Sequence, residues 1–261
     1  MTDLKFVILS DIHIGPELIE VANGWELRSA HDTKLLKRVF RFIDDFEPNI
    51  VILAGDQFNF DDISDYNKRY KIDKVPGSIK KAFESFKHLV AEPLRNVEQV
   101  WWMDGNHEAR LNKFVAEFPA LDGLLRFDEL FVDRELGVDL KHFSRGQIAR
   151  LGKLHVVHGD TIKGGGKHPA SALMGKYHCN IRCGHFHRYT IATENSLADA
   201  TQIKTAVTLP CLRNRQPGFL HNSPNAHIQG FDFGFITKKG NFNDYVVVDT
   251  GGFTVDGKHY S

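Results

Sequence analysis

The chain has 261 residues, of which 42% are hydrophobic, so it is long enough to form one medium α/β domain with a sizeable core. Lys and Arg together number 33, and so do Asp and Glu, which gives a formal net charge of zero and disfavours a strongly basic nucleic-acid binder. Three cysteines make no complete disulfide framework, and no apolar run reaches the length of a signal peptide or a membrane span, so we expect a cytoplasmic protein.

The first half of the chain predicts strands that alternate with helices. Apolar runs at residues 5–10, 49–54 and 97–103 are typical of buried central strands. Between them, apolar residues recur at helical spacing over residues 33–46 and 79–90. This alternation favours parallel strand pairing through crossover helices.

The second half begins with a fourth predicted strand at 153–158, and residues 177–183 lead into a fifth. After Arg188 the sequence changes to strand-like segments without helices between them. This suggests an antiparallel part of the sheet, or a second sheet packed on the first. The segments are 205–211, 230–239 and 244–250.

We expect a single domain over residues 1–261, because no repeat, linker or low-complexity tract divides the chain. Polar or partly helical stretches at about 57–80 and 110–150 are interpreted as insertions. The glycine-rich run 164–168 lacks the spacing and the strand-to-helix context of a phosphate-binding P-loop. We favour a flexible loop over a site, in which His168 is a candidate substrate contact.

Each predicted buried strand ends in residue types that bind metals. Carboxyl ends of adjacent strands lie at one edge of a sheet, where open α/β folds place their sites. In the Asp-x-His and His-x-His motifs the two side chains are two residues apart, so an extended backbone would direct both to the same side. The candidate ligands are Asp11, His13, Asp56, Asn106, His158, His185 and His187.

These ligands offer oxygen and nitrogen donors and no thiolate. Such a set suits Mn²⁺, iron, Zn²⁺, Ni²⁺ or Co²⁺, and it disfavours an iron–sulfur cluster or a structural zinc site. A pair of divalent ions can hold a phosphoryl group and lower the pKa of a bridging water, whose hydroxide then attacks phosphorus in line. We therefore expect two divalent metal ions, with manganese as the first choice, and a phosphate ester as the substrate.

The motif series D-x-H, G-D, G-N-H-E, H-G-D and G-H-x-H resembles that of the calcineurin-like metallophosphoesterases over residues 11–187. The resemblance implies a four-layer α/β/β/α sandwich in which two mixed sheets are flanked by helices. It also implies a dinuclear metal site. The ligand roles carried over are Asp11, His13 and His187 for one ion, Asn106, His158 and His185 for the other, and Asp56 as the bridge.

His107 resembles the family histidine that contacts the substrate phosphate and helps to protonate the leaving oxygen, a task that suits an imidazole pKa near neutrality. Many relatives orient this histidine with an aspartate three residues after the bridging one. Here that position is Asn59, so Asn59, Asp61 and Asp62 are alternative partners for the imidazole. Asn59 is retained as a candidate catalytic residue.

Arg110, just after the G-N-H-E turn, is a candidate for holding the phosphate through two hydrogen bonds, and an ion pair with Glu108 or Glu117 is the alternative. The expected catalytic residues are His107, Asn59 and Arg110, and the expected substrate contacts are Asn106, His107, Arg110 and His168.

The chain lacks the G-D-x-x-D-R-G element of the serine/threonine phosphatases, which weakens a phosphoprotein phosphatase function. We therefore favour a phosphodiesterase that acts on nucleic acid or nucleotides. A phosphomonoesterase or protein phosphatase is the alternative, and a non-catalytic scaffold of the same fold is a third hypothesis. The run G-N-H-E-A-R-L and the ending around 252–258 resemble phage and prophage members, which would place the protein in the host cytoplasm.

Overall fold

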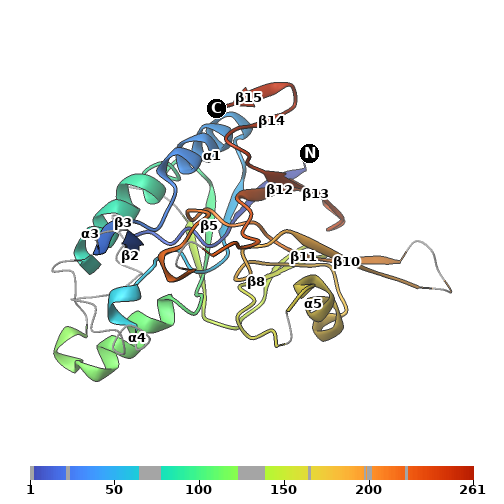
Figure 1. Cartoon of the computed structure of the whole chain (residues 1–261). Coiled ribbons are helices and arrows are strands. Elements are labelled where there is room, and N and C mark those ends of the chain that lie inside the picture. Colours follow the sequence, from blue (N-terminus) through green and yellow to red (C-terminus); the bar gives the residue numbers. More distant parts are fainter. Residues whose placement is uncertain are drawn as a thin grey trace.

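The computed structural model describes residues 3–21, 24–64, 78–122, 139–163, 166–196, 198, 202–220 and 223–261. Two mixed sheets pack face to face, and helices cover their outer faces (Figure 1). The layers run helix, sheet, sheet, helix, which confirms the α/β/β/α sandwich expected from the sequence.

The first sheet has the strand order β13-β12-β1-β4-β5-β6. Its strands β1, β4 and β5 are parallel, as the alternation of strands and helices predicts. Strand β6, which was not predicted, pairs parallel to β5, while β12 runs antiparallel to β1 and to β13. The bounds are Leu4–Leu9 for β1, Ile50–Leu53 for β4, Gln99–Met103 for β5, Asp139–Phe143 for β6, Gly230–Ile236 for β12 and Phe242–Val248 for β13.

The second sheet has the order β10-β11-β9-β8-β7, with β8, β9 and β11 parallel and the two edge strands antiparallel. The predicted fourth and fifth strands thus belong to this second sheet. The bounds are Ala149–Leu151 for β7, Leu154–Val157 for β8, Ile181–Cys183 for β9, Thr190–Asn195 for β10 and Ile203–Thr208 for β11.

The last strand-like segments return to the first sheet instead of completing a separate one. Phe231 and Phe233 of β12 pack against Phe42 of the helix at residues 33–46, in the apolar cluster between the first sheet and its helices. Ile236 belongs to the cluster between the two sheets. Both faces of β12 are therefore buried. A strand buried on both faces carries a continuous apolar pattern that does not indicate which sheet it joins.

Helix α1 (Thr33–Phe46) is capped at its N-terminus by Asp32, whose carboxylate accepts hydrogen bonds from the backbone N–H groups of Lys34 and Leu35. Helix α3 (Ser78–Phe86) continues into a π-helical turn, η2 (Lys87–Ala91). Figure 1 shows α1 and α3 on the outer face of the first sheet and α5 on the outer face of the second. The other helices are α4 (Glu108–Glu117), α5 (Pro169–Tyr177), η1 (Asp61–Ile63), η3 (Pro119–Leu121) and η5 (Gly218–Leu220).

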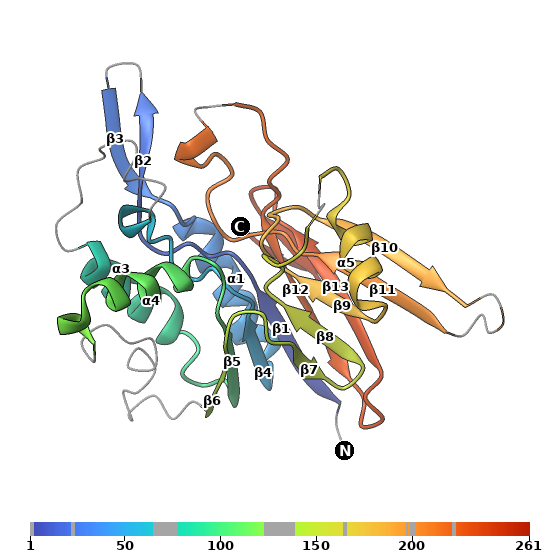
Figure 2. The ribbon, with the colours of Figure 1, turned by 90° about the horizontal axis from the view of Figure 1, so that it is seen from below.

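Two hairpins and a terminal ribbon extend from the sandwich. The hairpin β2–β3 and the hairpin β10–β11 project from different sides in Figure 2. The remaining bounds are Pro16–Val21 for β2, Gly24–Ser29 for β3, Phe253–Val255 for β14 and Lys258–Tyr260 for β15. None of the helices in the described part of the chain has the length and apolar character needed to cross a membrane.

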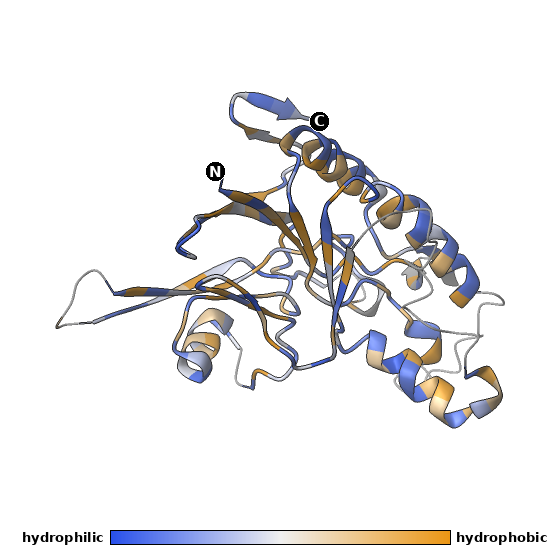
Figure 3. Cartoon of the chain, turned by 180° about the vertical axis from the view of Figure 1, so that it is seen from behind, coloured by the Kyte–Doolittle hydropathy of each residue, from blue (hydrophilic) through white to orange (hydrophobic). Residues whose placement is uncertain are grey.

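The two sheets are joined by an apolar layer and by the buried side chain of Arg182. Ile8 of β1, Met103 of β5 and Val156 of β8 belong to the cluster between the sheets, and Figure 3 shows the apolar residues concentrated on the strands and on the inward sides of the helices. Within the same interface, Nη2 of Arg182 on β9 donates to Oδ1 of Asp244 on β13 over 2.9 Å. This contact ties the second sheet to the first.

The two stretches interpreted as insertions are described only in part. Residues 65–77 of the first stretch and 123–138 of the second lie outside the described residues, as do residues 164 and 165 of the glycine-rich run. Within the second stretch, the described part contains helix α4 and strand β6, which pairs with β5 in the first sheet.

Candidate metal centre

Segments that follow the ends of the central strands meet at one edge of the two sheets. Asp11 and His13 follow β1, and His187 follows β9. Oδ1 of Asp11 lies 3.0 Å from Nε2 of His187 and 3.9 Å from Nε2 of His13, and the two Nε2 atoms are 3.3 Å apart. All three side chains are buried, and they offer one potential metal-ligand atom each within 4.8 Å of one another.

A second group lies beside the first. Asp56 follows β4, His158 follows β8 and His185 follows β9, and their potential ligand atoms again lie within 4.8 Å of one another. Nε2 of His158 is 3.3 Å from Oδ2 of Asp56 and 3.2 Å from Oδ1 of Asn106. Asn106 therefore joins this group, and all seven residues predicted as ligands are assembled.

Asp56 belongs to more than one group. Besides the group with His158 and His185, it forms a group with His13 and His107 whose potential ligand atoms also lie within 4.8 Å of one another. Oδ2 of Asp56 is 3.8 Å from Nε2 of His107. Asp56 thus stands between the two sets of side chains, as a bridging carboxylate would.

The expectation that an extended backbone directs both side chains of Asp-x-His and His-x-His to one side is wrong. Five of the predicted ligands have positive φ, in the left-handed region that is uncommon for residues other than glycine. The chain turns at each ligand instead of continuing as a strand. These residues and their φ angles are Asp11 (54°), His13 (55°), Asp56 (54°), His185 (70°) and His187 (53°).

Hydrogen bonds hold these turns in place. The backbone N–H of His13 donates to Asp56 O over 3.0 Å, and the N–H of His185 donates to Oδ2 of Asp11 over 2.8 Å. Left-handed residues cost of the order of 1–3 kcal/mol each, so they persist only where the surrounding structure determines them. The tertiary contacts between strand ends supply that determination here.

Two glycines of the motifs are required by close approach. A Cβ on Gly184 would lie 1.8 Å from the Ser10 hydroxyl and 2.4 Å from Oδ2 of Asp11. A Cβ on Gly105 would lie 2.1 Å from Oδ1 of Asp56. Any side chain at either position would therefore displace a predicted ligand.

The electrostatics of the centre are set by burial and by the mutual proximity of carboxylates and imidazoles. Burial opposes the charge on Asp56, but the imidazoles of His158 and His107 outweigh it and hold the Asp56 pKa well below its ordinary range. Burial also opposes a charge on His158, yet the Asp56 carboxylate raises the pKa of His158 to about 10. A cation that binds His158 would have to displace this proton, so metal binding would release a proton.

The side chains fit a pair of divalent cations. Burial and the Arg213 charge lower the pKa of His13, and burial and His158 lower the pKa of His185, so both imidazoles are neutral and able to act as ligands. Oxygen and nitrogen donors converge without a thiolate, a combination that suits first-row divalent metals.

His107 lies in the centre, but its orienting partner is not a side chain. Nδ1 of His107 contacts the backbone carbonyl oxygen of Asn59, while the Asn59 amide donates to Pro16 O and to Oδ2 of Asp61. Because a carbonyl oxygen can only accept a hydrogen bond, Nδ1 must carry the proton in this contact, and Nε2 is left facing Asp56. Burial lowers the pKa of His107 to about 4, so the ring is neutral near pH 7.

Arg110 supports the same carbonyl. Its Nη1 donates to Asn59 O over 2.9 Å and to Oδ1 of Asp61 over 2.7 Å. Arg110 therefore forms its ion pair with Asp61, and not with Glu108 or Glu117 as in the alternative considered from the sequence. Glu108 is fully buried instead, and its carboxylate accepts hydrogen bonds from the backbone N–H groups of Asp56, Phe58 and Gly105.

His168 stands apart from the residues just described. It is exposed at the beginning of α5, where its Nδ1 lies 2.8 Å from the Ser171 hydroxyl. No contact of His168 with the candidate ligands occurs among the described residues. Its role as a substrate contact stays a prediction.

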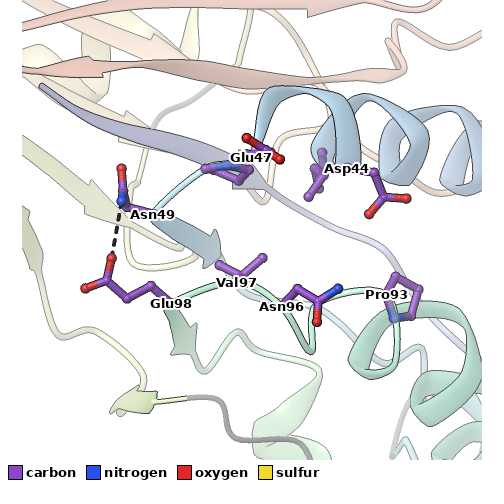
Figure 4. A pocket seen from close by; sticks show the side chains of 9 residues that line it. Asp44, Glu47, Asn49, Pro93, Asn96, Val97 and Glu98 are labelled. Carbon is purple, nitrogen blue, oxygen red and sulfur yellow. Dashed lines mark hydrogen bonds between the residues drawn. The ribbon is translucent and has the colours of Figure 1, made fainter. Parts of the chain in front are cut away.

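A cavity of about 330 Å³ lies at the opposite ends of the strands (Figure 4). Asn49 before β4 and Glu98 before β5 line it, together with Asp44 and Glu47 at the end of α1. The candidate ligands follow the carboxyl ends of these strands, whereas the cavity adjoins their amino ends. It is therefore separate from the metal centre.

Sequence reasoning missed one residue of the centre. The ring centroid of His227 lies 4.7 Å from that of His187, and the N–H of Ile228 donates to His187 O over 2.8 Å. His227 lies in the long segment between β11 and β12, and no motif surrounds it. Only the tertiary structure brings this segment to the centre.

Comparison with solved structures finds matches at low sequence identity. A dimetal phosphatase from Danio rerio matches with a TM-score of 0.42 and 11% identity over 91% of this chain and 94% of that one. YfcE, a phosphoesterase from E. coli, matches with a TM-score of 0.41 and 12% identity over 93% and 98%. The nuclease MPE of Pseudomonas putida matches with a TM-score of 0.38 and 12% identity over 88% and 84%.

No curated protein sequence matches the chain. The family model described as calcineurin-like phosphoesterase matches residues 4–189, a span that contains all the motifs and all seven candidate ligands. The chain therefore belongs to the calcineurin-like phosphoesterase family.

Proposed function

We propose that the protein is a phosphodiesterase that uses two divalent metal ions, with manganese as the first choice. The observation that carries this proposal is the position of Asp56, whose carboxylate lies within 4.8 Å of candidate ligands in two separate groups. When bound, two such ions neutralise the phosphoryl oxygens and lower the pKa of a water between them. The seven residues predicted as ligands would hold them.

His107 is proposed to contact the phosphate through Nε2. Its Nδ1 is engaged by Asn59 O, so Nε2 is the nitrogen available at the centre. A bound phosphate places negative charge beside this imidazole, which raises its pKa and lets Nε2 hold a proton for the leaving oxygen. Arg110 is proposed to act indirectly, because it is paired with Asp61 and supports the Asn59 carbonyl.

A diester substrate is favoured over a phosphoprotein because the G-D-x-x-D-R-G element is absent and Asn59 occupies the position of the orienting carboxylate. The experiment compares turnover of bis(p-nitrophenyl) phosphate and p-nitrophenyl phosphate with Mn²⁺. We expect the diester to be the better substrate. A clear preference for the monoester would contradict the diesterase assignment and favour a phosphomonoesterase.

The metal ions are tested separately. We expect Asp56→Asn to abolish turnover of both substrates and to reduce the metal content of the purified protein, which should approach two ions per chain in the wild type. Asp45→Asn, at an exposed position paired with Lys258, is the matched control and should leave both quantities unchanged. Wild-type protein that binds no metal and turns over neither substrate would favour the non-catalytic scaffold.

A cytoplasmic location, in the host if the chain is phage-encoded, is proposed from the sequence alone.

A further inference from the structure

An arginine that forms no ion pair with any described residue lies next to His187. Arg188 follows this candidate ligand directly and is half-buried, and its Nη1 donates to Gly166 O over 3.0 Å. Within the described part of the chain, no carboxylate lies within ion-pair distance of Arg188. Arg110 and Arg213, by contrast, are paired with Asp61 and Glu17.

The segment that Arg188 contacts carries further cations. Lys163 and Lys167 flank Gly166 in the connection between β8 and α5, and both are exposed. Neither forms an ion pair with any described residue. Helix α5 in turn packs on β10, which begins two residues after Arg188, and Figures 1 and 2 show the two elements side by side. The formal net charge of the chain is zero, so this excess of positive charge is local.

The ring of His227 packs against the His187 ring, with the ring centroids 4.7 Å apart. Its Nδ1 is buried and has no hydrogen-bond partner among the described residues. The ring as a whole is only half-buried, so Nε2 is the nitrogen that a ligand can reach.

We propose that Arg188 and His227 form a subsite for a second phosphate of an oligonucleotide, with Lys163 and Lys167 extending the positive surface beyond it. The inference rests on the proposed phosphodiesterase function and names its substrate class. The reaction adds water across one internal P–O bond and yields a phosphate monoester and a hydroxyl, while the neighbouring phosphate stays intact in the subsite.

An oligonucleotide differs in its number of phosphates from an isolated diester or a cyclic nucleotide. Such substrates carry one phosphate, which the metal centre itself would hold. The Arg188 guanidinium lies outside the centre, and among the described residues it donates only to Gly166 O. It is suited to a further phosphate because its planar fork matches two phosphate oxygens. A local cluster of Lys and Arg side chains is also the usual electrostatic signature of nucleic-acid binding.

The test compares two thymidine dinucleotides that contain the same internal phosphodiester. One has no terminal phosphate, and the other carries a phosphate at both ends. Cleavage of the internal bond by the Mn²⁺-loaded enzyme is followed by chromatography. We expect wild-type kcat/KM to favour the doubly phosphorylated dinucleotide by about tenfold or more, as one charge-assisted contact allows. In Arg188→Gln this ratio should fall to near one.

A matched control and a binding measurement complete the test. Arg95→Gln removes an exposed arginine beside the cavity at the opposite strand ends and should keep the wild-type ratio. For a fluorescent phosphorothioate oligothymidylate, we expect Arg188→Gln and the exposed variant Lys167→Gln each to reduce the slope of log Kd against log salt by about 0.7.

The outcomes separate the two proposals. If the wild type cleaves neither dinucleotide nor any simple diester, the proposed function fails. If it cleaves both dinucleotides without preference, or if Arg188→Gln keeps the preference and the salt slope, the subsite fails while the phosphodiesterase function stands. An equal loss of kcat/KM on both dinucleotides in Arg188→Gln would show that Arg188 only positions His187, and this result would also overturn the subsite.

Discussion

Replacement of Glu108 tests how the strand-end turns of the metal centre are held together. Its Oε2 accepts hydrogen bonds from the N–H groups of Asp56 over 3.0 Å and Gly105 over 2.8 Å, and Oε1 accepts from that of Phe58 over 3.1 Å. Glu108 is fully buried, so alanine would leave three backbone donors without a partner. Each such donor costs about 1–3 kcal/mol. We expect Glu108→Ala to lower the free energy of unfolding by at least about 3 kcal/mol.

Glu108→Gln should cost less free energy of unfolding than Glu108→Ala. Its single oxygen can occupy the Oε2 position and keep two of the three hydrogen bonds, while its amide N–H₂ faces the third donor. The expected loss for Glu108→Gln is therefore about 1–3 kcal/mol. Burial and the Asp56 charge raise the pKa of Glu108 to about 8, so urea unfolding followed by circular dichroism is best done at pH 9, where the wild-type side chain is ionised.

The control is Glu117→Ala, at an exposed position near the end of the same helix, which should change the stability by less than about 0.5 kcal/mol. The same turns position Asp56, so Mn²⁺ titration of the Glu108 variants should show weakened binding. A loss below about 1 kcal/mol in Glu108→Ala, or a larger loss in glutamine than in alanine, would refute the hydrogen-bond count.

Gly184→Ala should remove metal binding, measured by Mn²⁺ titration, because the added Cβ would collide with Ser10 and Asp11. In Gly175→Ala, in α5, the added Cβ meets open space, so the free energy of unfolding should rise by about 0.5–1 kcal/mol. Equal effects of the two variants would contradict the packing argument. Burial lowers the pKa of His31 from 6.5 to about 4, so the unfolded chain binds more protons between these values, and the free energy of unfolding should fall as the pH drops. In urea unfolding, His31→Gln should remove up to about 3 kcal/mol of the decrease in the free energy of unfolding between pH 7 and pH 4. An unchanged pH dependence would show that His31 does not cause this decrease.

Local sequence patterns predicted some features of the fold and not others. Helix α1 has the bounds expected from its apolar spacing, because the spacing and the Asp32 cap are local signals. The sheet membership of β12 was not predictable, because both of its faces are buried and its apolar pattern fits either sheet. The left-handed backbone at Asp11 and His13 was not predictable either, since hydrogen bonds to the end of β4 determine it.

The sequence by itself identified the family of this protein and the residues proposed as its metal ligands. Ligand types follow one another at strand ends in an order that identifies the family, and this information is carried by residue identity and spacing alone. Only the tertiary structure decided what surrounds the ligands. The Asn59 contact with His107 uses a backbone carbonyl, which every residue has, and His227 reaches His187 from a segment without a motif. Contacts of this kind depend on how distant segments pack, and packing leaves no periodic pattern in the sequence.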